Sequence, residues 1–142
     1  MAGHALAAHA LADAIVTAAR ACVGTRFRAQ GRTPGLALDC VGVALAAASA
    51  AGARPTTVPA YQLGGREEIG LELFLLGAGC RAVAIAASGD LLVVAPATGR
   101  RHLAVVTPGG VVHAHAGLGR VVEGPLDAAW TVTGRYRFPE AA

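Results

Sequence analysis

The sequence has no lysine, no asparagine, few aromatic residues and little charge. All 12 basic residues are arginine, and they are scattered against 9 acidic residues for a net charge of +3. Nucleic-acid binding usually needs a dense basic patch with interleaved aromatics, so this composition argues against a nucleic-acid partner. Hydrophobic residues reach 54%, which excludes a disordered chain. With 4% aromatics, a single domain over residues 1–142 must build its core from Ala, Val, Leu and Ile.

Long apolar runs are also absent. No segment reaches the roughly 18 uncharged apolar residues of a membrane-spanning helix, and the best run covers residues 40–53. The apolar N-terminus lacks a basic segment and contains Asp13, so no secretion signal is expected. The cysteines Cys22, Cys40 and Cys80 are odd in number and form no CxxC pair, which argues against a disulfide framework. We therefore expect synthesis in the cytoplasm and no membrane insertion.

Apolar periodicity predicts helices in the first half of the chain. Residues 5–22 show helical spacing, and a Gly/Pro/Arg-rich loop over residues 24–38 follows. Asp39 is expected to cap a second helix, almost wholly apolar and therefore buried, which ends near Gly52. A short third helix is predicted over residues 66–76.

The second half of the chain predicts strands. They are RAVAIAA (81–87), DLLVVA (90–95), HLAVVTP (102–108), GVVHAHA (110–116), RVVE (120–123) and TVTGRYRF (131–138). The PGG sequence at 108–110 predicts a hairpin between the third and fourth of these. Helices followed by strands predict an α+β fold, with N-terminal helices packed on a C-terminal antiparallel sheet.

Cys40 is the first candidate for chemistry. A thiol in the first turn of a helix lies at the positive end of the helix dipole, close to unpaired backbone N–H groups. Both effects favour the thiolate and can lower a thiol pKa from ~8.5 into the range ~3.5–7.5. Gly42 would let another element approach the helix closely at this turn.

Two histidines complete a possible catalytic set. His102 begins one strand of the predicted hairpin and His113 lies on the other, so their rings can meet. One ring could accept the Cys40 proton, giving a thiolate–imidazolium pair, while the other orients it. His115 shares the face of His113 by strand alternation and is a candidate substrate contact.

Several segments carry a family resemblance, in order along the chain. They are ARACVGTRFRAQGR (19–32), GLALDCVGVALA (35–46), VPAY (58–61), GDL (89–91), HLAVVTPGGVVHAHAGLGRVVE (102–123), and Trp130 with RYRF (135–138). The first resembles a "GTP(Y/F)RHQGR" segment and the second a "DCxGL" nucleophile helix. Together they resemble the NlpC/P60 cysteine peptidases, in particular the branch encoded in tail modules of tailed phages and gene transfer agents.

This resemblance implies a reduced papain-like fold that hydrolyses amide bonds in peptidoglycan stem peptides. Cys40 matches the nucleophile, His102 the general base and His113 the residue that orients the base. Asp39, which precedes the nucleophile, is a candidate substrate or oxyanion residue, and the Cys40 backbone N–H is a candidate oxyanion donor. Phe27 is a further candidate at the substrate or oxyanion position, where many members carry a tyrosine near the thiol; phenylalanine lacks that hydroxyl donor. No cofactor and no metal are implied.

The same resemblance implies a location and a partner. A wall hydrolase made without a signal peptide could be carried at the tail tip or baseplate of a phage-like particle and act at the bacterial cell wall. The expected partner is a tail hub or tip protein, bound largely through the first helix.

Three alternatives remain open. His9 and Asp13 with His113 and His115 match HxxxD…HxH, the ligand pattern of some zinc endopeptidases. The domain could instead be a catalytically silent structural or assembly component of a tail tip. A cysteine acyltransferase or amidase that acts on another amide or a lipid would use the same Cys–His pair.

Overall fold

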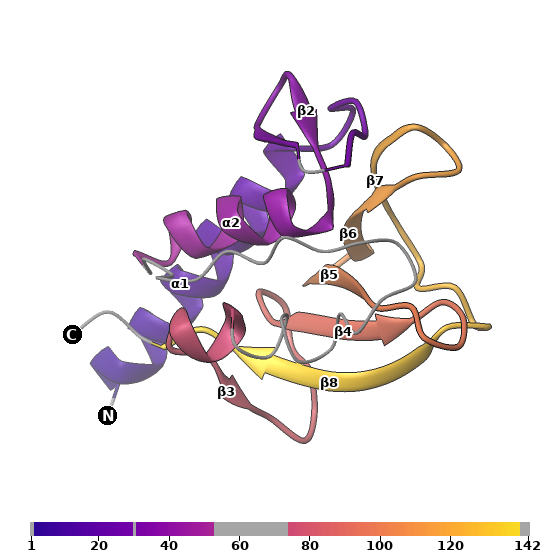
Figure 1. Ribbon diagram of the computed structural model, residues 1–142. Coiled ribbons are helices and arrows are strands. Elements are labelled where there is room, and N and C mark those ends of the chain that lie inside the picture. The colour runs from indigo at the N-terminus through magenta and orange to yellow at the C-terminus, as the bar shows by residue number, and fades with distance from the viewer. Residues whose placement is uncertain (1, 30, 53–73, 140–142) are drawn as a thin grey trace.

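Helices come first along the chain and strands follow (Figure 1). The computed structural model describes residues 2–29, 31–52 and 74–139. Its elements are α1 (Ala2–Ala21), β1 (Arg32–Thr33), β2 (Ala37–Leu38), α2 (Cys40–Ala50), β3 (Arg81–Ala82), β4 (Leu91–Ala95), β5 (His102–Thr107), β6 (Gly110–His115), β7 (Arg120–Gly124) and β8 (Thr131–Arg137). The predicted α+β class is confirmed. No helix among these residues has the length and hydropathy of a membrane span.

One antiparallel sheet holds the second half of the chain together. Its six strands run in the order β3-β8-β4-β5-β6-β7, so the last strand inserts between β3 and β4. Strands β5 and β6 pair with Thr107 opposite Gly110, which leaves Pro108 and Gly109 as the hairpin turn. Gly110 has a φ of +121°, a conformation that glycine adopts without strain. The hairpin predicted at PGG is therefore confirmed.

The predicted strand over residues 81–87 is wrong beyond its first two residues. Only β3 pairs in the sheet, and the chain then turns back toward β4. The Asp90 carboxylate holds this turn, because it accepts the Ala87 N–H at 2.7 Å and pairs with Arg137 through two 2.9 Å hydrogen bonds. Of the predicted helix over 66–76, the described residues 74–76 are helical, as is residue 77, and the rest of the prediction lies outside the described residues, as does the segment 58–61.

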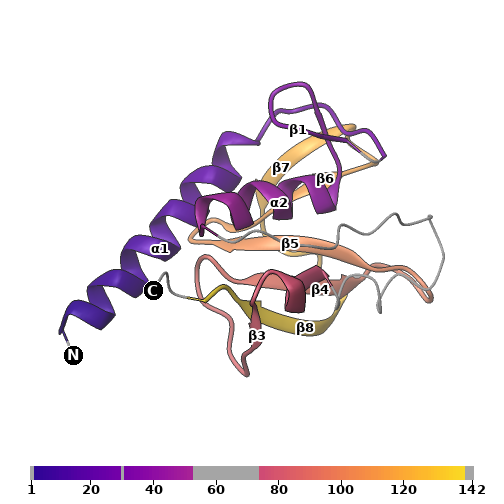
Figure 2. The ribbon, with the colours of Figure 1, turned by 60° about the vertical axis from the view of Figure 1, so that its left-hand side comes forward.

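The helices stack in layers on the sheet. Helix α1 packs on α2, and α2 packs on β5, as the rotated view shows (Figure 2). Leu91, Leu103 and Val105 share the main core with the buried face of α2. Strand alternation sends Leu92 and Ala104 to the opposite face, into a second cluster. The sheet is thus apolar on both faces, consistent with the largely apolar strands in the sequence.

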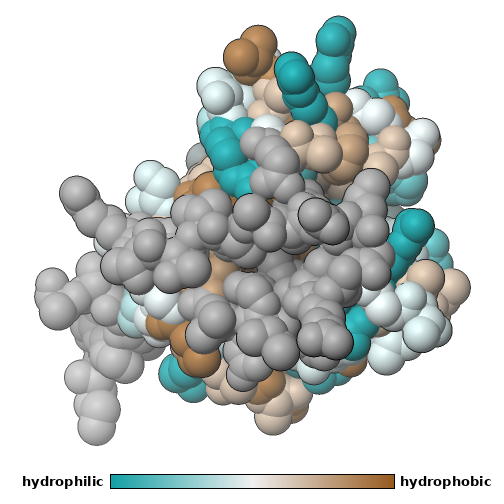
Figure 3. Space-filling view, viewed as in Figure 1, coloured by the Kyte–Doolittle hydropathy of each residue, from teal (hydrophilic) through white to brown (hydrophobic). Residues whose placement is uncertain are grey.

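The start of α2 is tightly enclosed by the loop before it. A Cβ at Gly42 would collide with the carbonyl oxygen of Gly31 and would lie 2.8 Å from the Leu38 side chain. The close approach that the sequence suggested for Gly42 is therefore present. On the face seen in Figure 3, hydrophilic side chains gather over the loop that carries β1 and β2. This loop contains the exposed Arg26 and Arg28.

Candidate active site

The imidazole rings of His102 and His113 form a direct hydrogen bond. Nε2 of His102 lies 3.0 Å from Nδ1 of His113, and the rings are nearly perpendicular, with centroids 5.1 Å apart. The β5–β6 register places the two residues diagonally across the hairpin on the same face of the sheet. The prediction that these rings meet across the hairpin is confirmed.

Both rings have low pKa values. Burial, followed by the charges of His113 and His115, lowers the pKa of His102 to about 3. Burial and then the charge of His115 lower the pKa of His113 to about 4. Both imidazoles are therefore neutral near pH 7. If Nε2–H of His102 donates to His113, the Nδ1 lone pair of His102 is available as a base.

Burial of His102 opposes the thiolate–imidazolium pair expected from the sequence. Forming that pair in the resting protein would place a cation on a ring whose charged form is disfavoured by desolvation. The neutral ring is instead suited to accept a proton during the attack of a nucleophile. The electrostatics favour general-base chemistry over a pre-formed ion pair.

Cys40 is the first residue of α2, as predicted. Asp39 is the N-cap, and its carboxylate accepts the Gly42 N–H at 2.8 Å. The Cys40 side chain is only 5% exposed and packs in the main core cluster with Leu103 and Val105 of β5. The sequence forms a helix here because Asp39 satisfies a free N–H group at its start and an apolar run follows.

Strand alternation puts the imidazoles on the other face from Leu103 and Val105. His102 lies two residues from Ala104 on β5, and His113 lies two residues from Val111 on β6, so each lies on the same face as a residue of the second cluster. His102 is also the first residue of β5. A contact between a thiol at the start of α2 and this ring would therefore have to pass around the end of the strand rather than through the sheet.

Asp39 has a structural task in this fold. Its side chain is fully buried, and besides capping α2 it accepts a hydrogen bond from Nη1 of Arg32 at 2.5 Å. The carboxylate therefore joins the loop at β1 to the start of α2. This position supports the backbone of Cys40 and does not present Asp39 to a substrate.

Phe27 and His115, the other two candidate site residues, differ in their contacts. Phe27 bridges Leu38, and its ring packs on the main core. His115 ends β6, and its Nδ1 accepts the Leu118 N–H at 3.0 Å, so Nε2 carries the proton in the neutral ring. Its ring centroid lies 5.6 Å from that of His113. His115 is half-buried, which leaves it able to contact a ligand.

Sequence reasoning named Trp130 only with the closing strand and missed its place in the candidate site. Its ring stands edge-to-face against both imidazoles, with centroids 5.5 Å from His102 and 5.3 Å from His113. The three rings are mutually close to perpendicular, and the indole adds to the burial that lowers both pKa values. The signal available in the sequence was the single tryptophan directly before the closing strand.

The other two cysteines are poor nucleophiles. Burial raises the pKa of Cys22, whose thiol donates to the Ala18 carbonyl. Burial, and then the charge of Asp90, raise the pKa of Cys80 to about 12. Neither thiol forms thiolate readily near neutral pH.

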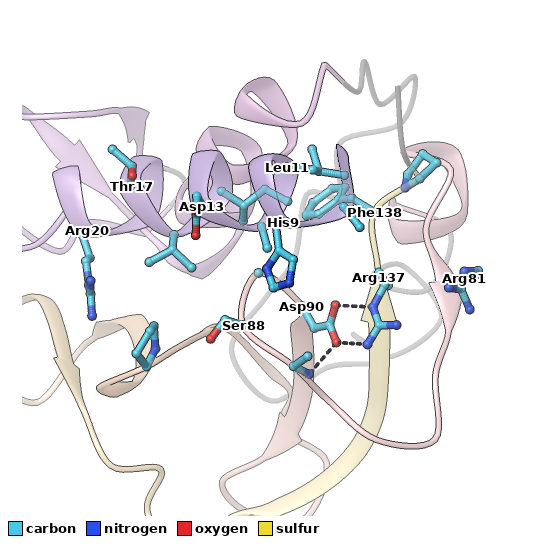
Figure 4. A pocket seen from close by; sticks show the side chains of 18 residues that line it. His9, Leu11, Asp13, Thr17, Arg20, Arg81, Ser88, Asp90, Arg137 and Phe138 are labelled. Atoms are coloured by element: carbon cyan, nitrogen blue, oxygen red, sulfur yellow. Dashed lines mark hydrogen bonds and ion pairs between the residues drawn. The ribbon is translucent and has the colours of Figure 1, made fainter. Parts of the chain in front are cut away.

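The residues of the zinc pattern are separated. A groove of about 1100 Å³ lies between α1, the turn before β4 and the end of β8, and His9 and Asp13 line it (Figure 4). His113 lies instead beside Trp130, and His115 lies next to His113. Among the described residues, no group of three or more His, Cys, Asp or Glu side chains could hold a metal ion. The HxxxD…HxH interpretation thus finds no support in the fold.

Two comparisons of the sequence with known proteins found no match. No protein-family model matches the chain, and no curated protein is significantly similar to it in sequence.

The buried imidazoles predict a loss of stability in mild acid. An unfolded histidine binds a proton near pH 6.5, whereas the folded rings stay neutral to about pH 3–4. The unfolded state therefore binds more protons in this window, and stability should fall by up to about 1.4 kcal/mol per pH unit for each ring as pH decreases.

Urea unfolding between pH 7.5 and 4.5 measures this effect. The variant H102Q/H113N cannot take up these protons, so its unfolding free energy should depend less steeply on pH, whatever its value at pH 7.5. His9→Gln, on the exposed face of α1, is the matched control and should keep the parent slope. An unchanged slope in the double variant would contradict the pKa assignment.

Proposed function

We propose that this protein is a cell-wall endopeptidase that hydrolyses an amide bond of peptidoglycan stem peptides through Cys40, His102 and His113. The observation that carries the proposal is the 3.0 Å hydrogen bond between the two imidazoles, on a hairpin whose first strand packs against the helix that Cys40 begins. The resemblance to NlpC/P60 peptidases supplies the substrate class and the reduced papain-like arrangement.

The proposed reaction proceeds in two steps. Nδ1 of His102 takes the thiol proton while the Cys40 sulfur attacks the amide carbon, and the Cys40 backbone N–H stabilises the oxyanion. The imidazolium then protonates the departing amine, which leaves a thioester. Water, deprotonated by the same ring, hydrolyses the thioester and restores the thiol. His113 accepts the Nε2–H of His102 throughout and fixes its tautomer.

Histidine variants test the roles assigned to the two rings. His102→Ala should reduce hydrolysis of purified peptidoglycan by roughly 10³-fold or more, because it removes the base. His113→Ala should cost less, about 10- to 100-fold, because it removes orientation rather than proton transfer. The readout is the appearance of new free amino groups in the digest. His9→Ala, which lies in the groove beside α1, is the control and should be fully active.

Three outcomes would contradict the proposed endopeptidase. If His102→Ala were as active as the parent protein, His102 would not be the general base. New reducing ends without new amino groups would show cleavage of glycan strands instead of peptides. Complete inactivity of the well-folded parent protein on several peptidoglycan types would favour the alternative, a catalytically silent structural component of a tail tip.

The same proposal includes a location at the tail tip or baseplate of a phage-like particle. Helix α1 offers small side chains, and the groove of about 1100 Å³ runs beside it, so a hub or tip protein could bind there (Figure 4). Gradient-purified particles should contain the protein, and Ala12→Arg on this groove should release it. Recovery only from the free fraction of a lysate would contradict the location.

A further inference from the structure

Two arginines face each other beside the imidazole pair. Arg26 and Arg120 are direct partners in an antiparallel bridge between the loop after α1 and β7. The flanking hydrogen bonds run from Val121 N–H to Thr25 at 2.8 Å and from Phe27 N–H to Gly119 at 2.8 Å. This is the non-hydrogen-bonded type of pair, in which the side chains approach most closely.

Like charges directly opposite each other disfavour a strand pair, and a bound anion would relieve this repulsion. Both side chains are exposed, and within the described part of the chain neither guanidinium makes an ion pair or hydrogen bond. The acidic residues of that part lie elsewhere: Asp39 pairs with Arg32, Asp90 with Arg137 and Glu123 with Arg20, Asp127 accepts the Ala129 N–H, and Asp13 lies on α1. The two positive charges are open to an external anion.

The arginine pair lies in line with the imidazoles. Arg120 is also the direct partner of His115 at the end of β6, so Arg26, Arg120 and His115 occupy one face on neighbouring strands. By alternation along β6, His113 lies on this same face. A ligand seated on the arginines would extend directly toward the hydrogen-bonded rings.

His115 adds a directed donor to this row. Its Nδ1 is taken by the Leu118 N–H, which leaves Nε2–H to point away from the turn. Gly117 makes room for the ring, because a Cβ there would lie 3.0 Å from Cε1 of His115. The turn thus fixes the orientation of the His115 ring, and the Nε2–H takes no part in the hydrogen bond to Leu118.

We propose that Arg26, Arg120 and His115 form a binding subsite for a carboxylate of the substrate. Two guanidinium groups and an imidazole N–H match the acceptor geometry of a carboxylate. This inference rests on the proposed function, under which the occupant is a free carboxyl group of a stem peptide. That group would be held next to the amide that reaches His102. The subsite would make the protein prefer peptides with that carboxylate over their amidated forms.

The test separates binding from hydrolysis. Cys40→Ala protein is titrated with a synthetic stem peptide that contains a free γ-glutamyl α-carboxylate and with the same peptide amidated at that carboxyl. The carboxylate form should bind more tightly than the amidated form. Arg26→Gln or Arg120→Gln, each added to Cys40→Ala, should weaken binding of the carboxylate form roughly 3- to 10-fold. Affinity for the amidated peptide should change little.

Arg81→Gln in the same background is the matched control, because Arg81 is an exposed arginine on β3 and the net charge changes equally. The subsite would be overturned if Arg26→Gln and Arg120→Gln kept the preference for the carboxylate peptide over the amidated peptide. It would also be overturned if Arg81→Gln lost this preference equally. Carboxylate selectivity that depends on Arg26 and Arg120, in a protein whose active form hydrolyses no peptidoglycan, would support the subsite while contradicting the proposed endopeptidase.

Discussion

Replacing Cys40 by alanine is expected to reduce peptidoglycan hydrolysis by at least about 10⁴-fold, since it removes the atom that forms the thioester. The fold should survive, because the change removes one sulfur from the first turn of α2 and leaves the Asp39 cap in place. Release of free amino groups measures the activity, and circular dichroism checks the fold. Iodoacetamide should modify Cys40 and inactivate the parent protein.

Cys80→Ala is the matched control for this variant. Cys80 is as buried as Cys40, at 5% exposure, but burial and Asp90 raise the pKa of its thiol to about 12. This variant should therefore keep its activity and its single alkylation site. Hydrolysis that survives in Cys40→Ala, or that a chelator abolishes while iodoacetamide does not, would refute the cysteine mechanism and restore the zinc alternative.

Local signals were sufficient to predict the position of Cys40 in the fold. Asp39 before an apolar run marks a helix start, and the N-cap hydrogen bond to Gly42 satisfies a free N–H group there. The PGG sequence similarly predicted the β5–β6 hairpin, and a fixed hairpin register determines which residues meet across it. The His102–His113 contact follows from that register.

Contacts between residues far apart in the chain could not be predicted from local sequence signals. Trp130 reaches the imidazoles only because β8 inserts next to β4, and nothing near residue 130 specifies that strand order. The bridge between Arg26 and Arg120 depends likewise on how the loop after α1 meets β7. The strand expected over 81–87 failed because the Arg137–Asp90 pair stabilises a turn that alternation alone does not show.

Asp39 shows how a resemblance and a structure can assign different tasks to one residue. The family pattern places it beside the nucleophile, among candidate substrate or oxyanion groups. In the fold it is fully buried, caps α2 and pairs with Arg32. A buried carboxylate with these contacts contributes to the position of Cys40 through the backbone, so its loss should appear first as a loss of stability.

Replacing Asp39 by alanine should lower the free energy of unfolding by about 2–4 kcal/mol, because it removes a helix cap and leaves Arg32, whose side chain is 24% exposed, without this partner. Urea unfolding at pH 7.5 measures the loss. Asp39→Asn should lose less, since its amide oxygen can still accept the Gly42 N–H while the charge is gone. Asp13→Ala, at an exposed position on α1, is the control and should change stability by less than about 0.5 kcal/mol.

Kinetics of the folded variant separate the structural role from a substrate role. If Asp39 acts only through the start of α2, Asp39→Asn at a temperature well below its transition should keep the KM of the parent protein for a stem peptide. Its kcat should fall modestly, because a less firmly capped helix holds the Cys40 thiol less well for attack. A raised KM with unchanged unfolding free energy would instead place the Asp39 carboxylate in contact with the substrate.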